Sequence, residues 1–300
     1  MSTNRRQFIA ASATTVASLP FTNAFAAAKK KPLFQISLAQ WTLVRELKSG
    51  KIDNLDFAKV ASEHDIKGLE YVNQFFMDKA LDRAYLRQMK QRAIDAGTKN
   101  LLIMCDREGR IGDPDGSKRN QTVENHRKWI DAARFLGCHS IRVNAGSAGT
   151  WEEQVKLAAD GLAKLTEHGA EAGMNVIVEN HGGLSSNAKW LATVIEKVGH
   201  KRCGTLPDFG NFRISKTESY DCYQGVKELM PLAKGVSVKD MSTDAKNNRI
   251  KVDFTKMMDL VLATGFRGHA GIEFGGFEGL NASRKALARA HSELTSKYSS

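Results

Sequence analysis

The chain has 300 residues, of which 42% are hydrophobic and 26% are charged, and its formal net charge is +11. This length fits one or two globular domains, because α/β barrels of about 250 residues commonly form a single unit. The composition excludes a low-complexity chain, and no apolar run approaches the roughly 20 residues that a membrane span needs. We therefore expect a globular protein without a membrane anchor.

The first residues have the features of a targeting segment. Arg5 and Arg6 precede a weakly hydrophobic stretch rich in Ala, Ser and Thr, and Ala24-Phe25-Ala26 has the small-x-small pattern of a signal peptidase site. This order of features resembles a twin-arginine signal, which exports proteins that have already folded. We predict a periplasmic or otherwise exported protein. Its expected parts are a signal peptide at residues 1–26, a linker at 27–33 and a barrel domain at 34–300.

The positive charge raises the question of a nucleic-acid partner. Removal of the targeting segment deletes Arg5 and Arg6 and no acidic residue, which lowers the formal charge from +11 to +9. The remaining Lys and Arg residues are scattered along helical patterns, without a basic helix, an aromatic stacking platform or zinc-finger spacing. We therefore expect no nucleic-acid partner. The cysteines lack CxxC spacing and are expected to be buried free thiols.

Beyond Pro32 the chain alternates short β-rich runs with amphipathic helical patterns, which is typical of a parallel sheet. Strands are expected at residues 34–38, 68–72, 100–105, 140–144, 175–179, 204–208, 235–239 and 269–274. Helices are expected at residues 55–64, 83–96, 123–136, 151–172, 187–198, 220–232, 254–264 and 284–298. Several of these helices end at a glycine suited to a C-cap, namely Gly97, Gly137, Gly173 and Gly265.

These units predict an α/β fold with a single (β/α)8 TIM barrel, since the composition does not change along them. An open, doubly wound sheet is the alternative, but no GxGxxG motif follows the first strand. Barrel enzymes carry their chemistry at the carboxyl ends of the strands. The polar residues at these ends are Glu70, Asn73, Asn144, Glu179, Asn180, His181, Asp208, Asn211, Ser237, Lys239, Asp240 and Glu273.

Three of these residues are carboxylates on strands five, six and eight: Glu179, Asp208 and Glu273. Buried carboxylates that converge without a partner are too costly to keep ionised. They therefore require a cation, an opposing lysine or shared protons. One divalent metal with water completing an oxygen-rich shell satisfies all three, which indicates Mn²⁺ or Mg²⁺.

Four short motifs in chain order resemble the xylose isomerase-like sugar isomerase/epimerase superfamily. They are Val178-Glu179-Asn180-His181-Gly182-Gly183, Leu206-Pro207-Asp208-Phe209-Gly210-Asn211, Val236-Ser237-Val238-Lys239-Asp240 and Gly271-Ile272-Glu273-Phe274. The resemblance covers nearly all of residues 34–298. It implies metal ligands at Glu179, Asp208 and Glu273 and a substrate contact at Asn211.

The sequence departs from the family pattern at the third metal ligand. A family-type His-x-Lys-Asp is here Ser237-Val238-Lys239-Asp240, and a serine hydroxyl is a poor replacement for an imidazole. His181 lies two residues after Glu179, so on an extended strand it points the same way and is expected to complete the shell or act as an acid/base. Lys239 could instead neutralise the carboxylates without a metal.

The expected chemistry is removal of a proton next to a carbonyl group of a carbohydrate, through an enediolate. Glu179 and Glu273 are the expected acid/base pair, with the metal or Lys239 stabilising the enediolate oxygen. A hydratase or lyase acting on a keto-sugar or keto-glycoside is the first alternative, and a non-catalytic sugar-binding barrel is the second. An apurinic endonuclease would need a histidine-rich multi-zinc cluster, for which only His181 is available.

Further substrate contacts are expected at Trp41, Glu70 and Asn144. Trp41 would form an apolar wall against a sugar face or pack in the core, and Glu70 would bind substrate or accept a structural hydrogen bond. The segment 106–120 is long enough for an active-site lid or a solvated loop. The identity of the sugar and the oligomeric state stay open.

Overall fold

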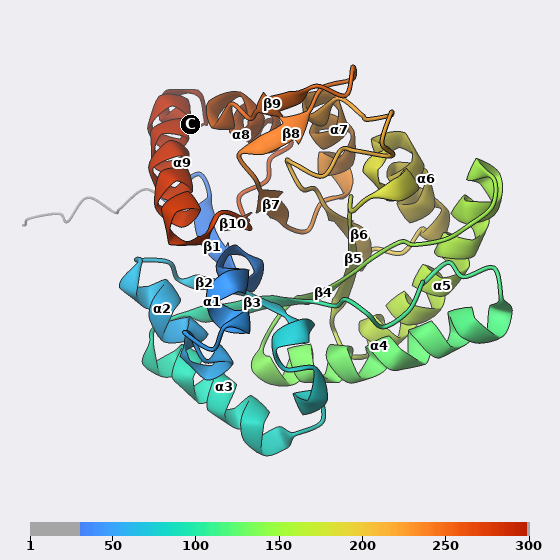
Figure 1. The fold of residues 1–300 in the computed structure, drawn as a ribbon, viewed down its shortest axis with the longest axis horizontal. Coiled ribbons are helices and arrows are strands. Elements are labelled where there is room, and N and C mark those ends of the chain that lie inside the picture. The colour runs from blue at the N-terminus through green and yellow to red at the C-terminus, as the bar shows by residue number, and fades with distance from the viewer. Residues whose placement is uncertain (1–30, 299–300) are drawn as a thin grey trace, which may run out of the picture. The chain divides into compact units, whose positions relative to one another are not determined.

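A computed structural model describes residues 31–298 of the chain. The predicted signal peptide at 1–26 and most of the predicted linker at 27–33 lie outside the described residues. The described part forms one compact unit in which helices surround a ring of strands (Figure 1).

The ring of strands is an eight-stranded parallel sheet. Its strands are β1 (Gln35–Ala39), β2 (Gly68–Val72), β3 (Lys99–Met104), β4 (Ser140–Val143), β5 (Asn175–Glu179), β6 (Cys203–Leu206), β7 (Val236–Val238) and β10 (His269–Ile272). Between β6 and β7 the ring closes through two isolated parallel bridges, Thr205 with Ala233 and Asp208 with Ser237. The predicted single (β/α)8 barrel is therefore confirmed, with each strand at or within a few residues of its predicted place.

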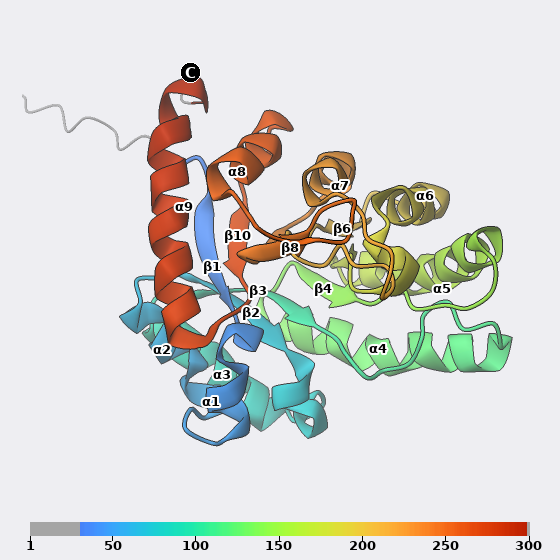
Figure 2. The same ribbon diagram turned by 45° about the horizontal axis from the view of Figure 1, so that its top comes forward.

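The helices pack around the outside of this ring (Figure 2). They are α1 (Val44–Lys48), α2 (Phe57–Glu63), α3 (Arg83–Asp95), α4 (Gly116–Leu136), α5 (Trp151–Glu171), α6 (Ala188–Val198), α7 (Cys222–Leu229), α8 (Phe254–Ala263) and α9 (Gly276–Tyr298). The predicted C-cap at Gly137 is confirmed, since this glycine ends α4 in the left-handed conformation with φ of 85°. No helix in the range 31–298 is both long and apolar enough to cross a membrane.

Two helices are longer than the hydrophobic periodicity predicts. α4 begins at Gly116, because the Asp115 side chain caps it by accepting hydrogen bonds from the amides of Ser117 and Lys118. Its first turns are polar and therefore carry no apolar pattern. Residues 116–120, at the end of the segment predicted to be a lid or a loop, are therefore helical. α9 likewise begins at Gly276 instead of residue 284.

A short hairpin after β7 has no counterpart in the prediction. Its strands, β8 (Met241–Thr243) and β9 (Arg249–Lys251), pair antiparallel. Each strand has only three residues, which is too short for a period-two pattern to be recognised. The hairpin follows Lys239 and Asp240 directly, and its Ser242 Oγ donates to the Gly210 carbonyl oxygen at 3.4 Å.

The barrel interior has an apolar floor and a polar rim. The floor is a small buried cluster of Ala39, Val72, Leu102, Met104, Ile177 and Leu206. Ile177 and Leu206 precede Glu179 and Asp208 by two residues, so they point to the same inner face, one layer deeper. A second, larger core packs the helices against the outside of the strands and includes the four cysteines, which are free and buried as expected. Many of the buried polar side chains thus lie beyond this floor, toward the carboxyl ends of the strands.

Candidate active site

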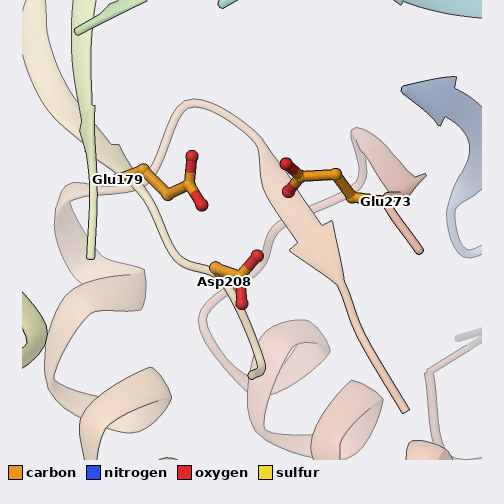
Figure 3. A group of neighbouring side chains, drawn as sticks. All are labelled: Glu179, Asp208 and Glu273. Carbon is orange, nitrogen blue, oxygen red and sulfur yellow. The ribbon is translucent and has the colours of Figure 1, made fainter. Parts of the chain in front are cut away.

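Three carboxylates meet at the carboxyl ends of the strands. Glu179 is the last residue of β5, Asp208 lies two residues after β6, and Glu273 follows β10. One oxygen from each carboxylate lies within 4.8 Å of the other two, and the residues are 0%, 0% and 3% exposed respectively. Figure 3 shows their side chains pointing toward one another. The expected convergence of these three residues is therefore present.

The Lys239 ammonium lies among the three carboxylates. Its Nζ is 2.6 Å from Asp208 Oδ2, 3.3 Å from Glu273 Oε2 and 3.9 Å from Glu179 Oε1. The aliphatic part of the side chain runs past Gly210, where an added Cβ would lie only 2.9 Å from both Cβ and Cδ of Lys239. A side chain at position 210 would thus displace the lysine, so the glycine helps to place the ammonium.

Arg142 supplies a second cation from β4. It is 2% exposed, and its Nε lies 3.0 Å from Glu179 Oε2 while one terminal nitrogen lies 2.8 Å from Asp106 Oδ1. Neither Arg142 nor Asp106 is expected at the site from the four motifs. The only signal is that Arg142 precedes Asn144 by two residues and therefore faces the same way. Asn144 contacts this pair, because its Nδ2 donates to Asp106 Oδ1 at 2.8 Å.

The pKa of Asp106 lies well below its usual range. Burial opposes its ionised form, but the Arg142 guanidinium and the amides of Gln74 and Asn144 outweigh that effect. Asp106 is therefore a permanent anion that shares Arg142 with Glu179.

Asn211 lies between Asp208 and Glu179, as its place in the motif suggests. Its Nδ2 donates to Glu179 Oε1 at 2.8 Å, while its backbone amide donates to Asp208 Oδ1 at 2.9 Å. The amide of Gly210 donates to the same Asp208 oxygen at 2.7 Å. The turn after β6 thus holds one oxygen of Asp208 and leaves the other for Lys239.

Ser237 occupies the position of the family-type histidine. Its Oγ donates to Glu273 Oε2 at 2.5 Å, and the residue is fully buried. The Ser237 hydroxyl therefore stabilises the Glu273 carboxylate, and position 237 offers no nitrogen ligand to a metal.

The two glutamates have opposite pKa shifts. Burial, together with the charge of Glu273, raises the pKa of Glu179 well above its ordinary value. Burial alone would also raise the pKa of Glu273, but Lys239, Arg142 and the Ser237 hydroxyl together lower it. The surroundings therefore favour a proton on Glu179 more than on Glu273. This split is the one that an acid/base pair requires.

Glu70 lies deeper in the barrel than the other carboxylates. It is 2% exposed, accepts a hydrogen bond from Ser37 Oγ at 2.5 Å, and its Oε2 has no hydrogen-bond partner among residues 31–298. An added Cβ at Gly271 would lie 2.4 Å from both of its oxygens. Burial raises the pKa of Glu70 to about 7. This placement favours the structural interpretation of Glu70 over a direct substrate contact.

A cavity of about 620 Å³ opens beside the carboxylates. Trp41, Lys239, Glu273 and Phe277 are among its lining residues, and Trp41 contributes one aromatic wall. A second cavity of about 640 Å³, between β9, α8 and α9, contains none of the three carboxylates. His181 is exposed in the loop after β5 and does not join the carboxylate group, although its backbone amide donates to Ser185 Oγ at 3.0 Å.

A family model described as "Xylose isomerase-like TIM barrel" matches residues 58–296, which is well over half of the chain. The chain belongs to the xylose isomerase-like TIM barrel family. The family match agrees with the fold. Comparison with curated protein sequences gives no match.

Solved structures of this fold superimpose over most of the chain. A xylose isomerase domain protein from Planctomyces limnophilus has 16% identity and a TM-score of 0.68, and the match covers 89% of this chain and 99% of that chain. The 3-keto-D-glucoside 4-epimerase from E. coli has 16% identity and a TM-score of 0.66, with coverage of 86% and 99%. A xylose isomerase-like barrel from Mycobacterium smegmatis in complex with magnesium has 17% identity and a TM-score of 0.65, with coverage of 88% and 97%. At these identities the likeness establishes the fold.

The donor set of this family member fits a hard divalent cation. Four carboxylates, of Asp106, Glu179, Asp208 and Glu273, face two cations, Arg142 and Lys239, so with all four carboxylates ionised two formal negative charges would be in excess among the described residues. The converging donors are all oxygens, which Mg²⁺ and Mn²⁺ prefer, whereas zinc favours sites with nitrogen or sulfur. The buried acidic triad could therefore hold a metal ion.

Proposed function

We propose that this barrel is a sugar isomerase or epimerase that moves a proton next to a carbonyl group with the help of one divalent metal. The observation that carries the proposal is the pair of buried glutamates, Glu179 and Glu273, which face one another with opposite pKa shifts. Family membership supports it, as do structural neighbours whose names are those of sugar epimerases.

In this proposal Glu273 is the base. It begins ionised and lines the cavity, so it removes the proton from the carbon next to the carbonyl group. The electrons of the broken C–H bond form a carbon–carbon double bond, and the carbonyl oxygen takes up the negative charge of an enediolate. Glu179 begins protonated and supplies a proton on the return step. The position and face that receive this proton decide between isomerisation and epimerisation.

Glu179, Asp208 and Glu273 would hold the metal, with Mn²⁺ or Mg²⁺ as the ion, and Glu179 would bind it through the oxygen that does not carry the proton. When bound, a divalent ion polarises the substrate carbonyl group and stabilises the negative oxygen that develops. Lys239 lines the same cavity and can donate a hydrogen bond to a substrate oxygen.

The remaining expected site residues would contact the sugar, hold the acidic residues in place or transfer protons. Trp41 offers its ring to an apolar sugar face, and Asn211 and Asn144 fix the carboxylates of Glu179 and Asp106. In this proposal His181, which is exposed in the loop after β5, would pass protons to solvent. We expect an unphosphorylated sugar, because export takes the protein away from intracellular sugar phosphates.

The test is proton exchange with solvent. The wild-type protein, supplied with Mn²⁺, is incubated in D₂O with a panel of free ketoses and keto-glycosides, and deuterium on carbon is followed by NMR. We expect exchange with at least one substrate, and a loss of at least 100-fold in Glu179→Gln and Glu273→Gln. Glu63→Gln, an exposed glutamate on α2, is the matched control and should exchange at the wild-type rate.

Other outcomes separate the alternatives. Release of an aglycone, or gain or loss of water, would assign the site to the hydratase or lyase class. Binding of a sugar without any exchange would leave a binding barrel and contradict the enzyme proposal.

We also propose that the protein is exported through the twin-arginine route. Support comes from the order of paired arginines, weakly hydrophobic stretch and Ala24-Phe25-Ala26 within residues 1–26. Export of a folded protein would allow the metal to be loaded in the cytoplasm.

A further inference from the structure

We propose that the Lys239 ammonium and the divalent metal exclude one another from the carboxylate cluster, so that metal entry moves Lys239 into the sugar cavity. The inference rests on the metal site of the proposed function. It assigns Lys239 a second position in the cavity, because its ammonium now lies between the carboxylates that would bind the metal.

Lys239 occupies the space that the ion requires. The three carboxylates offer oxygens that lie within 4.8 Å of one another, so an ion bound to all three must lie between them. Lys239 Nζ is already there, at 2.6 Å from Asp208 and 3.3 Å from Glu273. These are hydrogen-bond distances, and a metal bound to the same oxygens would lie against the ammonium.

This position of Lys239 is held by its surroundings. The stem of the side chain fills the space left by the missing side chain of Gly210. The side chain is only 18% exposed, and three acidic partners surround its charged end. Ser237 contributes to the arrangement through its hydrogen bond to Glu273. Its hydroxyl is smaller than an imidazole and leaves the Glu273 carboxylate charged, so the Lys239 ammonium has space and an acidic partner there.

Repulsion makes the two cations alternatives. A divalent ion and an ammonium at van der Waals contact repel strongly in a buried site, where water screens the charges poorly. Lys239 can leave without unfolding the loop, since it also lines the cavity that Trp41 and Glu273 share. In the cavity the amine would meet a substrate oxygen. Metal binding would thus remove the Lys239 ammonium from the three carboxylates and bring it, as a hydrogen-bond donor, to the sugar.

The first experiment compares metal affinity in the full-length protein. MnCl₂ is titrated calorimetrically into wild type and Lys239→Met, with Lys251→Met, an exposed lysine on β9, as the matched control. We expect Lys239→Met to bind Mn²⁺ at least tenfold more tightly than wild type, and Lys251→Met to match wild type. A circular dichroism melt checks that each variant is folded.

The outcomes distinguish this inference from the proposed function. Equal or weaker Mn²⁺ binding by folded Lys239→Met would overturn the exclusion and leave the metal site intact. Absence of Mn²⁺ binding in both proteins would remove the metal from the proposed function and the exclusion with it.

A second measurement on the native chain covers the case in which Lys239→Met does not fold. Wild-type protein is labelled with an amine-reactive reagent with and without MnCl₂, and labelling of individual lysines is followed by mass spectrometry. We expect Mn²⁺ to speed the labelling of Lys239 at least threefold and to leave Lys251 unchanged. Unchanged or slower labelling of Lys239 at saturating Mn²⁺ would contradict the proposal.

Discussion

Asn180 holds Asp208 through a reciprocal pair of hydrogen bonds. Its Oδ1 accepts from the Asp208 amide at 2.7 Å, and its Nδ2 donates to the Asp208 carbonyl oxygen at 2.9 Å. The same Nδ2 donates to the Asn211 carbonyl oxygen at 3.1 Å. One fully buried amide on the loop after β5 therefore fixes the backbone that carries two site residues.

Replacement of Asn180 by Asp should disturb this backbone, because a carboxylate cannot donate to the two carbonyl oxygens. We expect a loss of about 1–3 kcal/mol in the free energy of unfolding and at least a tenfold fall in exchange rate. Urea denaturation and the D₂O assay measure the two effects. Asn175→Asp is the control, since Asn175 donates to His139 at the opposite end of β5 and its loss should spare exchange. Wild-type activity in Asn180→Asp would contradict the positioning role.

Replacement of Asp106 by Asn should lower the stability of the fold, because it removes one of the two carboxylates that share the Arg142 guanidinium. The change leaves Arg142, which is 2% exposed, with Glu179 as its remaining acidic partner at hydrogen-bond distance. We expect a loss of about 3–5 kcal/mol in the free energy of unfolding, since one partner of a buried ion pair is removed. Chemical denaturation at pH 7 measures it. Asp65→Asn, which breaks an exposed pair with Arg284, should change stability by less than about 1 kcal/mol. Equal effects of the two changes would count against a buried network.

Glu70 should make stability depend on pH. Its pKa is raised from 4.5 to about 7, so between these values the folded protein binds more protons than the unfolded chain. The contribution of Glu70 to the free energy of unfolding therefore falls as pH rises through this interval and levels off above it. Glu70→Gln removes this dependence. The stability of the variant relative to wild type should rise by up to about 3 kcal/mol from pH 4.5 to pH 8.

Urea titrations of both proteins at the two pH values measure this difference. Glu63→Gln, at an exposed position on α2, should show the same offset from wild type at both. A constant offset for Glu70→Gln as well would mean that Glu70 is not held in its neutral form.

The paired arginines should be required for export. In a bacterial host with a twin-arginine pathway, we expect the wild-type chain to appear in the periplasm as a form that begins at Ala27. Substitution of both Arg5 and Arg6 by Lys should leave the full-length precursor in the cytoplasm. Cell fractionation and N-terminal sequencing measure the result. Substitution of Lys29 and Lys30, beyond the expected cleavage site, is the control, and export of the double-lysine variant would contradict the route.

The barrel and the main acidic residues of its mouth could be predicted from the chain alone. Alternating strand and helix patterns are local signals, and parallel strands bring their carboxyl ends to the same face. Glu179, Asp208 and Glu273 could therefore be placed together from their positions at strand ends alone. The serine in place of a family-type histidine was likewise visible in one motif.

The partners of these charges could not be predicted and became clear from the folded barrel. Arg142 reaches Asp106 in the loop after β3 and Glu179 on β5, and neither distance is encoded by spacing along the chain. The insertion of Lys239 between three acids depends on Gly210, which precedes it by 29 residues and whose missing side chain makes room for it. Such contacts are fixed by strand register and side-chain packing, which arise only when the whole barrel closes.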